Sequence, residues 1–212
     1  TYPRNVPQLC APCHEKVDAA GKDSPESPIS SYLASVHGQA LNKSGLVVTA
    51  TCVSCHGPHA VLPAWNPKSK VNGDNVAVTC GKCHDGIEEK YEHSVHWRGK
   101  TGASRLLPSC KECHSGHKIG RVDADGFRDQ VRNQCGYCHE EQYESYFETF
   151  HGKVSRLGFE RAATCSDCHG QHDVLPIANP DSHMSPANRT ATCKTCHEDA
   201  HEGFTGYLAH GT

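Results

Sequence analysis

The feature that most constrains this chain is the five-residue motif Cys-x-x-Cys-His, which occurs seven times along its 212 residues. The motifs use all 14 cysteines of the chain. The cysteine pairs are Cys10/Cys13, Cys52/Cys55, Cys80/Cys83, Cys110/Cys113, Cys135/Cys138, Cys165/Cys168 and Cys193/Cys196. The residue after each pair is always a histidine, and these are His14, His56, His84, His114, His139, His169 and His197. Histidine fills only 17 of the 212 positions, so this agreement is not a matter of composition.

This spacing is the signature of covalent attachment of a c-type haem. The two thiols add to the two vinyl groups of one porphyrin, and the adjoining histidine is placed to ligate the iron from one face. The motifs therefore predict seven haems, held through the 14 cysteines and seven proximal histidines. Zinc knuckles and a disulfide framework stay open as other uses of paired cysteines. Neither requires a histidine after every pair.

A second set of seven histidines is predicted to supply the other axial ligand. Three of them, His59, His117 and His172, complete the longer pattern Cys-x-x-Cys-His-x-x-His. Because the proximal histidine on the same short loop already occupies one face of its haem, we expect each of the three to ligate a different haem. The other four lie in the spacers between motifs, and they are His37, His96, His151 and His210. Seven candidates for seven irons predict bis-histidine ligation.

Two spacers have helical periodicity. Residues 143 to 151 predict one continuous helix whose apolar face carries His151 and which ends at Gly152. Residues 29 to 37 repeat this pattern before Gly38. At the last haem His201 competes with His210, because it also lies on an apolar helical face, whereas we expect His93 and His183 at the surface.

The chain is internally duplicated. The stretch "TCVSCHGPHAVLPAWNP" (51–67) aligns with "TCSDCHGQHDVLPIANP" (164–180). We predict a single multihaem domain over 1–212, built from modules of two haems at about 1–67, 68–122 and 123–180 and a module of one haem at 181–212. The expected fold is mainly irregular, with short α-helices, almost no sheet and haems in place of an aliphatic core.

Composition supports this picture. Apolar residues make up 36% of the chain, too few for an ordinary aliphatic core of this length. The net charge of −3 comes without a basic stripe, which argues against a nucleic-acid partner. No apolar run is long enough to cross a membrane, and no signal peptide is visible.

The sequence resembles the multihaem c-type cytochromes, in particular those with Cys-x-x-Cys-His-x-x-His pairs that act in periplasmic or extracellular electron transfer or form filaments. The resemblance implies electron transfer through closely spaced bis-histidine haems, as an extracytoplasmic carrier or as a filament subunit. The expected partners are redox proteins or a mineral or other extracellular acceptor, or further copies of the chain in a homopolymer with end-to-end haem stacking. The alternative is a multihaem reductase of the nitrite, hydroxylamine or sulfite type. We expect no enzymatic activity, since seven distal candidates leave no iron open.

Overall fold

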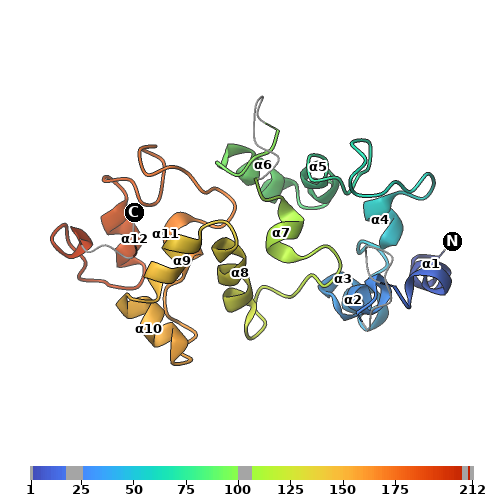
Figure 1. The fold of residues 1–212 in the computed structure, drawn as a ribbon, viewed down its shortest axis with the longest axis horizontal. Helices are drawn as coiled ribbons and strands as arrows, with labels where there is room; N and C mark the ends of the chain where they lie inside the picture. Colours follow the sequence, from blue (N-terminus) through green and yellow to red (C-terminus); the bar gives the residue numbers. More distant parts are fainter. Residues whose placement is uncertain (1, 18–25, 100–106, 207–209, 211–212) are drawn as a thin grey trace. The chain divides into compact units, whose positions relative to one another are not determined.

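The computed structural model describes residues 2–17, 26–99, 107–206 and 210. Over these residues the protein consists of short helices joined by long irregular connections, without a β-sheet (Figure 1), which confirms the predicted fold class. The α-helices are α1 (Val6–His14), α2 (Pro28–Ala34), α3 (Val36–Asn42), α4 (Cys52–His56), α5 (Val76–Gly81), α6 (Asp85–His93), α7 (Cys110–His114), α8 (Phe127–Gly136), α9 (Glu140–Tyr146), α10 (Phe150–Arg156), α11 (Cys165–His169) and α12 (Arg189–Lys194), and 3-10 helices span Pro3–Asn5 and Phe204–Gly206. None of the helices described is long and apolar enough to span a bilayer.

The chain forms two compact units. Unit 1 contains Thr1–Asp85 and Ser104–Ala124, and unit 2 contains Gly86–Ala103 and Asp125–Thr212. Each unit therefore consists of two separate stretches of the sequence. The boundaries of the units differ from those of the predicted modules. The single multihaem domain and its module boundaries stay predictions.

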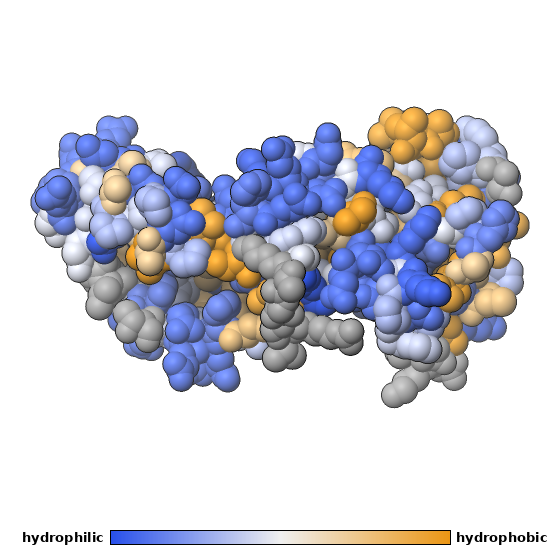
Figure 2. Space-filling model, turned by 90° about the horizontal axis from the view of Figure 1, so that it is seen from above, coloured by the Kyte–Doolittle hydropathy of each residue, from blue (hydrophilic) through white to orange (hydrophobic). Residues whose placement is uncertain are grey.

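Each unit has only a small apolar core. In unit 1 the core includes Ile29, Tyr32 and Leu41, and in unit 2 it includes Tyr146 and Phe147. Most of the face seen in Figure 2 is hydrophilic, with hydrophobic residues in separate patches. Aliphatic packing is therefore a minor part of what organises the described residues.

The two predicted continuous helices are wrong, because each is interrupted before its histidine. Ser35 separates α2 from α3 with an extended backbone, and its hydroxyl accepts a 3.1 Å hydrogen bond from the Gly38 N–H. Thr149 separates α9 from α10 in the same way and accepts from the Gly152 N–H at 3.2 Å. His37 and His151 consequently lie in the first turn of a new, capped helix, which turns the chain at that point.

Gly38 and Gly152 do not end helices as predicted; they lie inside α3 and α10. A Cβ atom on Gly38 would lie 2.1 Å from the carbonyl oxygen of Tyr32, and one on Gly152 would lie 2.2 Å from that of Tyr146. Glycine is needed at both positions because the histidine-bearing helix touches the backbone of the helix before it.

The sequence duplication is also a structural one. The hydroxyl of Tyr32 donates to the carbonyl of Ala50 at 2.9 Å in unit 1, and Tyr146 donates to Ala163 at 2.7 Å in unit 2. The proline- and asparagine-rich connections match as well. Asn75 donates its side-chain amide to the carbonyl of Ser69 at 2.9 Å, and Asn188 donates to Ser182 at 3.0 Å. These long connections therefore have a defined conformation.

Candidate haem centres

The seven motifs fall into two structural types, numbered here first to seventh in chain order. The second, fourth and sixth motifs are single-turn helices, α4, α7 and α11, that begin at the first cysteine. In the first, third, fifth and seventh motifs the first cysteine lies in a helix that begins before the motif: near the end of α5, α8 and α12, and in the middle of α1, which continues through His14. The two types alternate along the chain.

The second cysteine of each motif has a different environment in the two types. In the odd-numbered motifs it is exposed, and these residues are Cys13, Cys83, Cys138 and Cys196. In the even-numbered motifs it is half-buried, and these residues are Cys55, Cys113 and Cys168. The first cysteine is half-buried in every motif. Each odd-numbered motif thus presents one thiol toward the protein and one toward the surface.

All 14 motif cysteines lie within the described residues, and each is a free thiol there. A disulfide framework, which the sequence left open, is therefore not what joins these cysteines in the structure. Thioether attachment of haem stays a prediction for all 14 cysteines. For Cys113, Cys138 and Cys196, as for the others, this prediction depends on the spacing of the motif.

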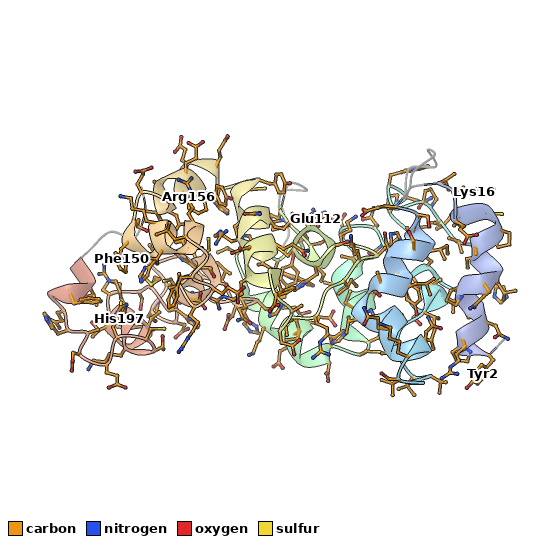
Figure 3. All side chains as sticks on the ribbon, turned by 90° about the horizontal axis from the view of Figure 1, so that it is seen from below. Tyr2, Lys16, Glu112, Phe150, Arg156 and His197 are labelled. Carbon is orange, nitrogen blue, oxygen red and sulfur yellow. The ribbon has the colours of Figure 1, made fainter. Side chains whose placement is uncertain are left out.

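The single-turn helices begin with reciprocal caps. The backbone N–H of Ser109 donates to the carboxylate of Glu112 at 2.6 Å (Glu112 is labelled in Figure 3), and that of Thr164 donates to Asp167 at 2.6 Å. Thr51 donates its N–H to the hydroxyl of Ser54 at 3.0 Å. Such capping boxes satisfy donors at the helix start, so they hold both cysteines and the histidine on one turn.

A left-handed backbone follows the proximal histidine in the same three motifs. The residues there are Gly57 with φ 88°, Ser115 with φ 67° and Gly170 with φ 85°. With ψ near 160°, this conformation belongs almost entirely to glycine. The turn redirects the chain, so that the x-x-His residue leaves the helix that carries its own motif.

The structure places each of five proximal histidines opposite a predicted distal histidine. In unit 1 the ring centroids of His84 and His37 are 6.2 Å apart and those of His56 and His117 are 6.0 Å apart. In unit 2 the pairs are His139 with His96 at 6.3 Å, His197 with His151 at 5.9 Å, and His169 with His210 at 5.8 Å. Figure 3 labels His197 among the side chains of unit 2.

These separations fit a metal ion between two imidazoles. A bond of about 2.0 Å from metal to imidazole nitrogen, and about 1.1 Å from that nitrogen to the ring centre, gives about 6.2 Å for two ligands in line. The residues present therefore fit axial ligation of haem iron by pairs of histidines.

The predicted distal histidines of these pairs are half-buried, and their environment favours the neutral ring. Burial is the main cause that lowers the pKa of His37, His96, His117 and His151, and the facing proximal histidine lowers it further. A neutral imidazole is the form that ligates metal. Unlike the proximal residues, these side chains owe their position to tertiary packing.

A backbone hydrogen bond anchors two of the spacer histidines. The N–H of Val36, next to His37, donates to the carbonyl of Ile119 at 2.8 Å, two residues beyond His117. The N–H of Val95, next to His96, donates to Val174 at 2.9 Å, two residues beyond His172. A spacer histidine is thus tied to the segment that carries an x-x-His residue.

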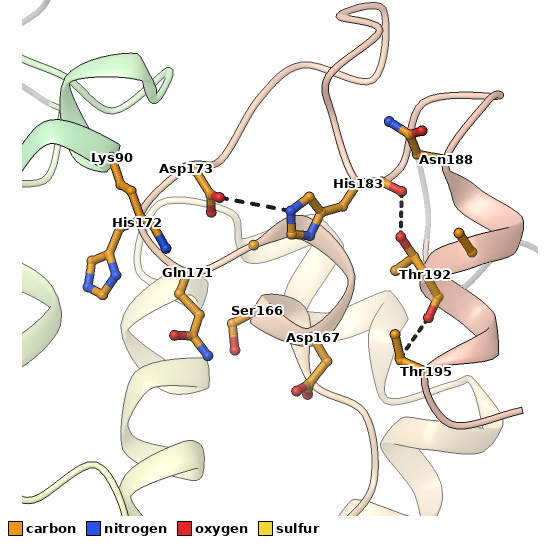
Figure 4. Close-up of a pocket in the computed structure, with 12 residues that line it drawn as sticks. Lys90, Ser166, Asp167, Gln171, His172, Asp173, His183, Asn188, Thr192 and Thr195 are labelled. Carbon is orange, nitrogen blue, oxygen red and sulfur yellow. Dashed lines mark hydrogen bonds and ion pairs between the residues drawn. The ribbon is translucent and has the colours of Figure 1, made fainter. Parts of the chain in front are cut away.

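The other predicted ligands have different surroundings. His14 and His59 are exposed, whereas His114 and His172 are half-buried. His172 lines a cavity of about 610 Å³ in unit 2 together with Lys90 and His183 (Figure 4). The ligand roles of these four predicted residues stay predictions.

At the C-terminal motif the structure differs from what the spacing suggested. The sequence left His201 and His210 as competitors for the iron held by His197. The residue facing His197 is instead His151, and His210 faces His169 of the sixth motif. His201 is exposed, as are His93 and His183, which were expected at the surface.

Cysteines of successive motifs lie beside one another within each unit. Burial and then the neighbouring Cys10 thiol raise the pKa of Cys52 to about 11. A hydrogen bond from Cys80 lowers the pKa of Cys110, and a hydrogen bond with Cys135 is the main cause that raises the pKa of Cys165. The first cysteines of motifs one and two, three and four, and five and six are therefore neighbours.

The second and third motifs approach one another through different cysteines. Burial raises the pKa of Cys55, and the next causes are Cys80 and Cys83 of the third motif. In unit 2 burial is the main cause that raises the pKa of Cys168 to about 11, and Cys193 and Cys196 of the seventh motif are among the others. Motifs one to four, and separately motifs five to seven, thus form continuous series of neighbours.

Comparison with known proteins finds weak similarity to cytochrome c-type protein NapC of Escherichia coli. NapC of strain K12 is 25% identical over 167 residues, which are 78% of this chain and 66% of the relative. NapC of E. coli O157:H7 matches with the same figures. The match thus covers slightly less than two thirds of the relatives' length. No protein-family model matches the chain, and no solved structure matches it significantly.

This similarity corrects the expectation that the chain has no enzymatic activity. That expectation depended on seven distal candidates leaving no iron open. The relatives are cytochrome c-type proteins, and their similarity connects this chain with redox chemistry without excluding catalysis. The categorical prediction is therefore wrong. What the motifs and the similarity do support together is a multihaem c-type cytochrome whose cofactor is covalent haem c.

Proposed function

We propose that this protein transfers electrons through seven c-type haems, most of them ligated by two histidines. The observation that carries the proposal is the set of five histidine pairs at 5.8–6.3 Å, each joining a proximal histidine to a histidine from elsewhere in the chain. Covalent haem c supplies one-electron chemistry at iron when it is bound. The chain's own residues hold it, orient it and fill both axial positions.

Two imidazoles on one iron fill both of its axial positions, which suits a centre that exchanges electrons. The reciprocal caps hold the thiols in place, while Ser35 and Thr149 hold the distal histidines. Such preorganised residues would hold the same two imidazoles at the iron in both oxidation states. They also bias the reduction potentials toward the low end of the haem range, as expected for strong imidazole ligation.

The order of the motifs in space supports stepwise transfer. Because neighbouring cysteines belong to successive motifs, the attachment points run in sequence order through motifs one to four of unit 1 and five to seven of unit 2. Haems held at these neighbouring cysteines would follow one another in the same order, and one-electron transfer along each unit is the chemistry that such a series would supply.

The proposed setting is the periplasm or the cell exterior, where c-type haem is attached. The partners would be redox proteins or an extracellular acceptor such as a mineral. A carrier and a subunit of a haem filament both fit these partners. Electron micrographs of the purified protein distinguish the two, since a filament is visible directly.

Intact mass of the purified protein tests the cofactor assignment. We expect seven haem additions to the 23.0 kDa chain, and fewer would contradict it. Voltammetry of the protein adsorbed on an electrode tests the function, with reversible one-electron waves that account for every haem as the expected result. Waves replaced by a catalytic current with nitrite, hydroxylamine or sulfite would indicate a reductase and overturn the proposal.

A further inference from the structure

Two arginines of unit 2 each have a buried nitrogen atom without a hydrogen-bond partner. Among the side chains of the described residues, the buried nitrogen atoms that lack a partner are Nε of Arg132 and Nε of Arg189. Arg132 as a whole is only 8% exposed. Because burial of a guanidinium is unfavourable unless other groups compensate its charge, these positions raise the question of what the charge does.

Arg132 lies between two helices that carry residues of the haem centres. It belongs to α8, one helical turn before Cys135 of the fifth motif. Its Nη1 donates to the hydroxyl of Ser155 at 2.6 Å, and Ser155 lies one turn after His151 in α10. The guanidinium therefore connects the helix that carries a haem-attachment cysteine with the helix that carries a distal histidine.

The charge of Arg132 also acts on the sixth motif. A hydrogen bond with Cys135 and then burial raise the pKa of Cys165, whereas Arg132 is among the causes that lower it. A cation has this effect because it stabilises a negative charge placed nearby. The attachment points of the fifth and sixth motifs are thus both within the electrostatic reach of Arg132.

The groups around Arg132 compensate its charge only in part. Asp129 lies 2.8 Å from its Nη1, but the side chain of Asp129 is 59% exposed, so that water and salt screen the carboxylate. The buried ring of Phe147 lies 5.2 Å from the guanidinium carbon of Arg132 and 4.1 Å from that of Arg156, which is labelled in Figure 3. Two cations against one ring leave this place positive.

The corresponding positions of unit 1 are apolar. Three residues before the first cysteine of the first motif stands Pro7, and four residues after His37 stands Leu41, where unit 2 has Arg132 and Ser155; both Pro7 and Leu41 are fully buried. Arg189 has such a counterpart too, because the residue four before the first cysteine of the third motif is the buried Val76. The duplicated fold therefore forms without arginine at these positions.

Unit 1 has a positive charge at the surface of the same region. Arg4 takes the place of Asp129, six residues before the first cysteine, and it is exposed. An exposed charge is screened within about 10 Å at ordinary ionic strength, whereas a buried charge is screened much less. The two units thus differ in the burial of positive charge at corresponding places.

We propose that the buried Arg132 raises the reduction potentials of the haems of the fifth and sixth motifs above those of the first and second, and that Arg189 does the same at the seventh motif relative to the third. Reduction adds one electron, and with it one negative charge, to a haem, and a nearby cation stabilises that form. The electron comes from the redox partner of the proposed function, on which this inference rests. Electrons that equilibrate over the chain then collect in unit 2.

Voltammetry of the purified holoprotein tests the proposal through the variant Arg132→Met. A buried unit charge roughly 10 Å from an iron, at an effective dielectric constant of about 20, changes the ratio of reduced to oxidised haem about tenfold, which is about 59 mV for one electron. We expect waves of the fifth and sixth motifs to move down by about this amount. Arg132→Lys keeps the charge and should restore the potentials, which a purely structural role of arginine does not predict.

Two comparisons assign the shift to the buried charge. The matched control is Lys153→Met, which removes an exposed cation of α10. Any shift that it causes should disappear at 1 M salt, at which the screening length is about 3 Å, whereas the shift in Arg132→Met should persist. In the Cys135→Ala/Cys138→Ala background, which lacks the fifth attachment site, one of the moved waves should be missing.

Asp129→Asn tests the same charge without altering the buried side chain. It removes the carboxylate beside Arg132, so the waves that move down in Arg132→Met should move up, most clearly at low ionic strength. If Arg132→Met fails to bind seven haems or loses low-spin signals, Asp129→Asn decides alone, and waves that stay in place overturn the proposal. Arg189→Met should lower a different wave, that of the seventh motif.

The outcomes separate this inference from the proposed function. Reversible one-electron waves at the same potentials in the parent protein, Arg132→Met and Asp129→Asn overturn the inference and leave the proposed function intact. A holoprotein with seven haems by mass but without reversible waves contradicts the proposed function itself.

Discussion

The glycine inside the histidine-bearing helix offers the sharpest test of the proposed ligation. In Gly38→Ala the new Cβ would lie 2.1 Å from the carbonyl oxygen of Tyr32 and 2.8 Å from the Cα of Leu33, all within backbone that cannot turn aside. Ordinary contact begins at 3.4 Å, so α2 and α3 must separate by about 1.3 Å, the difference between 3.4 Å and 2.1 Å. Overpacking of this kind costs about 1–3 kcal/mol of stability.

The same movement should break one axial bond. His37 lies in the helix that has to move, and a metal–imidazole bond of about 2.0 Å does not survive stretching by more than half its length. We expect one additional high-spin ferric haem in Gly38→Ala, assigned to the third motif. Added imidazole should restore the low-spin spectrum. Gly152→Ala, with its Cβ 2.2 Å from the carbonyl of Tyr146, should do the same at the seventh motif.

Gly86→Ala is the matched control, because a Cβ there has no neighbour within 4 Å. Gly86 lies in α6, where alanine favours the helix by about 1 kcal/mol over glycine. This variant should keep every haem low-spin. A Gly38→Ala protein with the spectrum of the control would refute the claim that close helix contact positions His37 on an iron.

Three further changes test separate parts of the structure. His210→Ala should create one high-spin haem at the sixth motif, and an unchanged resonance spectrum would remove His210 from the ligand set. Ser115→Gly should raise the free energy of unfolding by about 1 kcal/mol, because Ser115 has a left-handed backbone conformation that glycine adopts freely. Denaturant titration measures this difference, and a less stable variant would contradict the prediction. Burial alone would raise the pKa of Asp167, but hydrogen bonds from Thr164 and Arg128 outweigh it and lower the pKa. Asp167→Asn should therefore cost about 1 kcal/mol near neutral pH. The difference should begin to shrink as the pH falls through the ordinary value of 3.8 and should vanish only below the lowered pKa of the folded carboxylate, where the wild-type side chain is protonated in both states. Asp123→Asn, at an exposed ion pair with Arg121, is the control and should leave the denaturation midpoint unchanged.

Where the helices break could have been predicted in part. Ser35 and Thr149 are good caps, and each directly precedes a short segment of the form apolar-His-Gly. The apolar periodicity around them nevertheless indicated unbroken helices, because periodicity reports which residues would share a face of a helix and not whether the axis turns. The close contact that Gly38 and Gly152 allow is visible only when both helices are in place.

The sequence by itself predicted the cofactor chemistry and the set of residues proposed to serve it. Attachment of haem is local, since two thiols and one imidazole within five residues are enough, so the motifs identify it without any knowledge of the fold. Pairing of axial ligands is not local. Which imidazole faces which proximal histidine depends on how the chain crosses itself, and only the tertiary structure placed His151 opposite His197 and His210 opposite His169. The count of seven candidates for seven irons was a property of the sequence, whereas the pairing of the partners is a property of the folded chain.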